Sequence, residues 1–143
     1  MKKFLWITPF LLAMQMAPLP KSRAELLLRQ WIMVSMEIDG TKFTEEAFAQ
    51  KRAQGRATVM QFLKGGTSYV KIYTNSIHGR AVSSTKRNSW KLNEEETQLI
   101  IKSEDEPTPQ VFNIVKLTAK KMVLAYDDKG TRQVFYYDAY SEK

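Results

Sequence analysis

The chain has 143 residues, of which 43% are hydrophobic and 26% are charged, so it suits one folded domain and excludes a disordered chain. It contains no cysteine, which excludes disulfides, thiol catalysis and zinc–thiolate sites. The net charge is +7, but four of the 22 basic residues lie in the first 24 residues, so the remainder is only mildly basic and predicts no nucleic-acid surface.

The first 24 residues have the pattern of an export signal. Two lysines precede a short apolar stretch, which falls below the roughly 20 apolar residues that a membrane span needs. Ser22 and Ala24 are small residues at the −3 and −1 positions of a cleavage site, and Ala17 offers a second site. We predict that residues 1–24 are a signal peptide, that residues 25–143 are the mature domain, and that the protein is exported to the periplasm or secreted.

Eight short segments with strand composition follow one another, and turn signals such as Asp39-Gly40, Gly65-Gly66 and Asp127–Gly130 separate them. The segments are 31–38, 58–63, 68–74, 80–92, 99–102, 110–117, 120–126 and 133–137. Connections this short make neighbouring strands antiparallel. Eight such strands close into a barrel whose interior holds side chains or one small ligand. We therefore predict an all-β fold, an eight-stranded up-and-down antiparallel β-barrel.

One helix is expected after the first strand, over Thr44–Gln54. Thr44 suits the N-cap, Glu45 and Glu46 suit the first turn, and a glycine follows the last turn. Few of its residues, Phe48 among them, are apolar, so the pattern indicates a short lid or plug.

Four motifs follow one another in a familiar order. They are Leu28–Trp31, Phe62–Tyr69 with its Gly-Gly-Thr turn, Ser89–Leu92 followed by Leu99–Ile101, and Val115–Thr118 followed by Met122–Leu124. Together they resemble the lipocalin-like domains of exported bacterial proteins, within the calycin group. The resemblance implies a ligand-binding barrel whose base is closed by Trp31. Arg29 stands where a typical lipocalin has glycine, and Arg132 begins the last strand, where better-known members carry an arginine at its end to cover the tryptophan.

The chain offers no catalytic constellation. His78 is the only histidine and falls in a predicted turn, so neither a metal site nor a histidine-dependent nucleophile is expected. The acidic clusters Glu94–Glu96, Glu104–Glu106 and Asp127-Asp128 also fall in predicted turns, where water solvates them. Lys86-Arg87 is interpreted as a solvated strand end. We predict a protein that is not an enzyme and has no cofactor and no metal.

Aromatic and methionine side chains on the strands are the candidates for function. Such groups line adaptable apolar cavities, and phenol hydroxyls can orient a ligand. The predicted ligand-binding residues are Met60, Phe62, Tyr73, Trp90, Phe112, Tyr126 and Tyr136. The leading prediction is an exported, non-catalytic protein that binds a small apolar or amphipathic ligand.

Two alternatives stay open at this stage. Several strands are apolar on both faces, so the barrel could be solid and bind another envelope or secreted protein, or a second copy of the chain, through its outer surface. A hydrolase or isomerase would need a buried carboxylate with a raised pKa facing a cavity.

Overall fold

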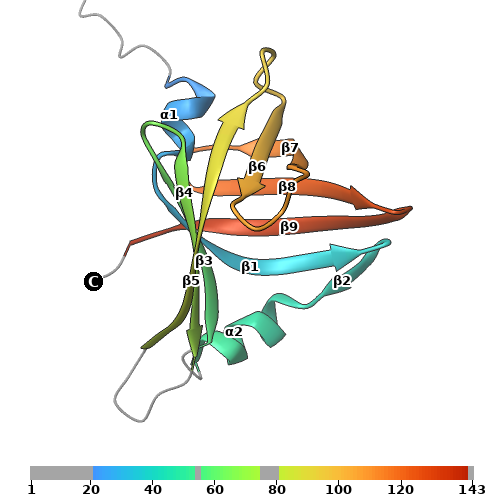
Figure 1. Ribbon diagram of the computed structural model, residues 1–143. Helices are drawn as coiled ribbons and strands as arrows, with labels where there is room; N and C mark the ends of the chain where they lie inside the picture. The colour runs from blue at the N-terminus through green and yellow to red at the C-terminus, as the bar shows by residue number, and fades with distance from the viewer. Residues whose placement is uncertain (1–20, 54–55, 75–80, 142–143) are drawn as a thin grey trace, which may run out of the picture.

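The computed structural model describes residues 21–53, 56–74 and 81–141, and within these ranges the chain forms nine strands and two short helices. The strands pair antiparallel in the order β2-β1-β3-β4-β5-β6-β7-β8-β9, and β1 also pairs with β9, which closes the sheet (Figure 1). Their bounds are β1 Gln30–Ile38, β2 Thr41–Phe43, β3 Ala57–Leu63, β4 Thr67–Thr74, β5 Ala81–Leu92, β6 Gln98–Ser103, β7 Gln110–Leu117, β8 Lys121–Asp128 and β9 Thr131–Tyr140. The predicted eight-stranded up-and-down barrel is confirmed, with β2 as an additional short arm on β1.

The hairpin of β1 and β2 was not expected from the sequence, although its turn was. Asp39 and Gly40 both have positive φ, of 48° and 82°, which is the conformation of a tight two-residue turn. Lys129 and Gly130 form the same kind of turn between β8 and β9. Asp127-Asp128 therefore ends β8 and does not belong to the loop.

Two helices lie at opposite ends of the barrel (Figure 1). α2 (Glu45–Ala53) confirms the predicted helix, and the Ala47 amide donates to the hydroxyl of its N-cap Thr44 at 3.3 Å. α1 (Arg23–Leu27) was not predicted, because five residues are too few to show a helical period. Its N-cap is Ser22, whose hydroxyl accepts from the amide of Glu25.

The end of the barrel beside α1, called the base here, is a packed apolar core. Trp31 is 0% exposed, and its indole N–H donates to the carbonyl oxygen of Leu27 at 3.2 Å. Phe62, Leu99 and Met122 are buried in the same cluster. The structure thus places Trp31 at the base, as the resemblance implied.

Arg29 covers Trp31 although it lies just before β1 and not at the end of the last strand. Its guanidinium carbon lies 5.6 Å from the centre of the Trp31 ring, which is a cation–π geometry. The same guanidinium donates to the carbonyl oxygen of Ala119 in the β7–β8 turn. Arg29 therefore covers the Trp31 ring from a position before β1, in place of an arginine at the end of β9.

At the other end, called the mouth, the barrel divides. β3 pairs with β1 only over residues 30–32 of β1, while β2 takes over at residues 36–38. β5 pairs with β6 only over residues 88–92 of β5. The outer halves of β3, β4 and β5 therefore separate from the rest of the barrel, and this separation leaves space beneath α2.

Candidate functional site: the barrel cavity and its mouth

A cavity of about 260 Å³ occupies the barrel between the base core and the mouth. Seven strands and the β6–β7 loop contribute side chains to its wall. The apolar wall residues are Met33, Met60, Val70, Ile101, Phe112 and Phe135, and the polar ones are Thr58, Lys86, Asn88, Ser103, Glu106, Gln110 and Tyr137. An apolar wall with a few polar groups is the usual composition of a small-molecule site.

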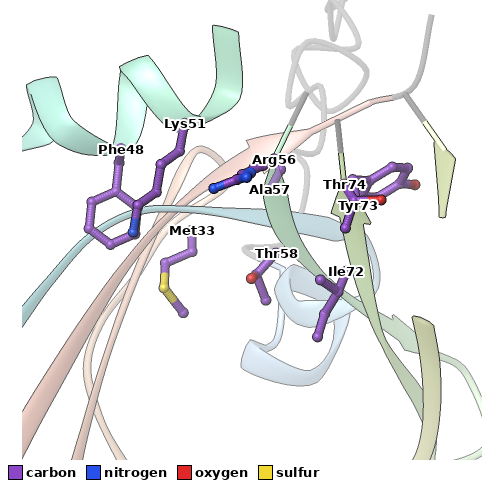
Figure 2. A pocket seen from close by; sticks show the side chains of 9 residues that line it. All are labelled: Met33, Phe48, Lys51, Arg56, Ala57, Thr58, Ile72, Tyr73 and Thr74. Atoms are coloured by element: carbon purple, nitrogen blue, oxygen red, sulfur yellow. The ribbon is translucent and has the colours of Figure 1, made fainter. Parts of the chain in front are cut away.

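A second pocket of about 220 Å³ lies at the mouth and continues this cavity. The two share Met33 and Thr58 in their walls. Figure 2 shows Phe48 and Lys51 reaching from α2 toward Met33, while Arg56 and Thr58 come from the β3 side. Ligand sites usually measure roughly 300–1,000 Å³, so a ligand of ordinary size would occupy both spaces.

The inner face of β5 is polar at Lys86 and Asn88, where it lines the cavity. Lys86 pairs with Val70 of β4, and Asn88 pairs with Ser103 of β6, so these side chains share the inner face. Asn88 is only 7% exposed, whereas Lys86 is exposed and reaches water while lining the cavity. Lys86 was interpreted from the sequence as part of a solvated strand end. The exposure agrees with this, but the position does not, because Lys86 lies within β5 and lines the cavity.

Tyr137 brings a phenol to the opposite side of the cavity. It pairs with Met33 of β1 and Met122 of β8 and is 5% exposed. Burial raises the pKa of the phenol far above its ordinary value, because the low-dielectric surroundings disfavour the phenolate. The hydroxyl is therefore neutral at physiological pH and forms no hydrogen bond with any described residue, which leaves it able to donate to a ligand.

Five of the seven predicted ligand-binding residues lie inside the barrel near the cavity or the base. Met60 and Phe112 line the cavity itself. Tyr126 stacks on Phe112, with ring centres 5.2 Å apart. Phe62 lies deeper, in the base core, where it meets Trp90 edge-on at 5.6 Å.

Trp90 is the fifth residue of that group, and Tyr73 and Tyr136 lie apart from it. Trp90 packs at the base, and its indole N–H donates to the Leu63 carbonyl oxygen at 3.0 Å. Tyr73 borders the mouth pocket and packs with Ile32 and Val59 in a separate cluster (Figure 2). Tyr136 pairs with Ser35, on the face opposite to that of the cavity-lining Phe135 and Tyr137.

On the outer face, Tyr136 takes part in a polar cluster with Glu37 and Lys42. Its hydroxyl donates to a Glu37 carboxylate oxygen at 3.0 Å, and the Lys42 ammonium lies 4.9 Å from its ring centre. The hydrogen bond to Glu37 raises the pKa of the Tyr136 phenol, with burial as the next cause. This cluster fastens β2 and β1 to β9, a structural role that differs from the expected one.

The seven predicted ligand-binding residues do not include the wall residues Met33, Lys86, Phe135 and Tyr137. Lys86 and Asn88 share a two-residue period with the core-packed Trp90 and Leu92, and this period was the signal that could have placed Lys86 inside. No comparable signal distinguished Tyr136 from Tyr137, because both faces of β9 carry aromatic side chains.

Among the described residues, no three histidine, aspartate or glutamate side chains come close enough to hold a metal ion. Neither α1 nor α2 has the length and hydropathy that a helix needs to cross a membrane. The predicted turn at 75–79, with His78, lies outside the described residues.

The comparison with protein families agrees with this geometry. The family model of the lipocalin-like domain matches residues 27–124, which is more than half of the chain. The chain belongs to the lipocalin-like domain family. None of the curated protein sequences compared with this lipocalin-like chain matches it.

Two solved structures are similar to this lipocalin-like protein. Japanin from Rhipicephalus appendiculatus, in a structure bound to cholesterol, has 9% sequence identity and a TM-score of 0.55, over 84% of this chain and 79% of japanin. The siderocalin Ex-FABP, described as functioning through dual ligand specificities, has 13% identity and a TM-score of 0.44, over 82% of this chain and 76% of that one. At such identities the japanin likeness shows the fold alone.

Proposed function

We propose that this protein is a non-catalytic binding protein that holds one small apolar or amphipathic molecule in its barrel. The observation that carries the proposal is the cavity of about 260 Å³, with six apolar wall residues and continuation into the mouth pocket. A solid barrel would fill this space with side chains. Burial of apolar ligand surface would supply the affinity, and the few polar wall groups would orient the ligand.

The family and fold support this function by similarity. The cholesterol in the japanin structure belongs to japanin and sets no ligand for this chain. Because proteins of one fold can have different functions, the cavity is the main support for the proposed binding function. The signal-like residues 1–24 support the further proposal that the protein acts after export, in the periplasm or outside the cell.

The interaction-module alternative has less support. Large apolar side chains that are exposed, such as Phe43, Val111 and Val115, lie on β2 and β7. Scattered exposed apolar residues are ordinary on soluble proteins, and they identify no partner.

Native mass spectrometry of the full chain, purified gently, tests the binding proposal. We expect an adduct of a few hundred daltons that leaves on denaturation. Val70→Phe, which adds volume inside the cavity, should abolish the adduct. Val123→Phe is the matched control, because Val123 pairs with the outward Tyr136 and should leave the adduct intact. A clean apo mass, unchanged after incubation with fatty alcohols, fatty acids, sterols and haem, would contradict the proposal.

A further inference from the structure

A row of polar side chains crosses the inner face of the barrel, perpendicular to the strands. Ser68 of β4 pairs with Asn88 of β5, and Asn88 pairs in turn with Ser103 of β6. Directly opposed residues in antiparallel strands project to the same face, and Asn88 and Ser103 both line the cavity. We call Lys86, Asn88 and Ser103 the polar wall, with Ser68 behind it.

The polar wall lacks internal partners. The hydroxyl oxygens of Ser68 and Ser103 are buried and have no hydrogen-bond partner within the described ranges. Asn88 lies between these two serines and is only 7% exposed, so its carboxamide adds a polar group to the same largely buried row. Buried polar groups are almost always hydrogen-bonded, so an unpartnered set on a cavity wall indicates a group that arrives from outside.

The charge on this side of the cavity is mainly positive. Lys86 lines the cavity with no ion pair to any described residue, and Lys51 and Arg56 line the adjoining mouth pocket. Glu106 of the β6–β7 loop also borders the cavity, and it forms no salt bridge with Lys86. Three cations against one carboxylate favour a negatively charged ligand group.

We infer that the polar wall binds the carboxylate of an amphipathic ligand, whose hydrocarbon part lies against Met33, Phe112 and Phe135. This inference rests on the proposed function and names the chemical class of its ligand. The Lys86 ammonium, the Asn88 amide and the Ser103 hydroxyl are all hydrogen-bond donors, and an ionised carboxylate accepts several such bonds. The long stem of Lys86 packs along the cavity while its ammonium keeps contact with water.

The test compares two ligands that differ only in the head group. Binding of dodecanoate and of dodecanol to the full chain is measured by titration calorimetry, below the concentrations at which either aggregates. We expect the carboxylate to bind at least about tenfold more tightly than the alcohol, because charge-assisted hydrogen bonds are the stronger kind. Lys86→Met should remove most of this preference, because it should lower the affinity for dodecanoate much more than the affinity for dodecanol.

Two further variants complete the design. Lys116→Met makes the same charge change on the outward face of β7 and should keep the preference. Ser103→Ala removes a hydroxyl that has no partner, so it should weaken dodecanoate binding severalfold without lowering the midpoint of unfolding. If Ser103 had only a structural role, Ser103→Ala would lower the midpoint of unfolding and leave dodecanoate binding unchanged.

The outcomes separate the inference from the function on which it rests. Equal affinity for both ligands, or a preference that survives Lys86→Met, would overturn the carboxylate assignment while the binding function stands. Failure of both ligands to bind would overturn the assignment and also count against the proposed function.

Discussion

Replacement of Trp31 by phenylalanine should be the most damaging conservative change at the base of the barrel. Trp31 is 0% exposed and donates to the Leu27 carbonyl oxygen at 3.2 Å. The substitution removes this hydrogen bond, worth about 1 kcal/mol, although the Leu27 carbonyl oxygen keeps a second donor, the Arg29 amide at 2.7 Å. It also leaves a cavity where the indole was larger than the phenyl ring, which costs on the order of 1–2 kcal/mol.

We therefore expect Trp31→Phe to lower the free energy of unfolding by about 2–3 kcal/mol, which for a domain of this size is a fall in Tm of roughly 10–15 °C. Trp90→Phe is the matched control. Trp90 also donates to a backbone carbonyl, that of Leu63 at 3.0 Å, but it is only half-buried, so water can replace the bond. Trp90→Phe should lower the free energy of unfolding by about 1 kcal/mol.

Urea unfolding followed by far-ultraviolet circular dichroism measures both variants, because that signal does not depend on either indole. A loss for Trp31→Phe that is no larger than the loss for Trp90→Phe would refute the reasoning, since it would mean that the contacts with Leu27 and Arg29 contribute nothing beyond those of a half-buried indole.

Three other predictions concern pH, the mouth and the N-terminus. The pKa values of the Tyr136 and Tyr137 phenols are raised in the folded state, so folding opposes their ionisation and the free energy of unfolding should fall above about pH 10. The urea midpoint should therefore be lower at pH 11 than at pH 8, and the decrease should be smaller in Tyr137→Phe than in the unaltered protein. Phe48→Ala should weaken ligand binding severalfold, because Phe48 borders the mouth pocket. It should change the unfolding free energy by less than about 1 kcal/mol, because Phe48 lies outside the base core. A large loss of stability with unchanged ligand affinity would contradict this. Intact mass of the exported protein should show cleavage after Ala24, which removes the N-cap Ser22 and the first two residues of α1, Arg23 and Ala24. An uncut chain outside the cell would contradict the signal assignment.

The strands and turns could be predicted because their signals are local. The turns at Asp39-Gly40 and Lys129-Gly130 each contain a glycine with positive φ, and the segments between turns have the composition of strands. α2 was equally readable from its N-cap and charges. α1 and β2 are too short to produce a period, so their existence depends on contacts with the rest of the barrel.

The assignment of faces could not be made from the sequence. β1 appeared apolar on both sides because a bulge between Met33 and Ser35 shifts the alternation along the strand. Met33 lines the cavity before the bulge, and Met36 pairs with the cavity-lining Phe135 after it. A one-residue shift exchanges the inner and outer sets, so the sequence alone could not show which residues of β1 face the cavity.

The sequence by itself determined that the chain is an antiparallel β-barrel with a lipocalin-like order of motifs, since strand period, turn chemistry and motif spacing are properties of short segments. Only the tertiary structure decided that the barrel holds a cavity, that Lys86 and Asn88 face it, and that Arg29 covers Trp31. Each of these depends on register and closure between strands distant in the chain, and the incomplete pairing of β1 with β3 and of β5 with β6 creates the mouth.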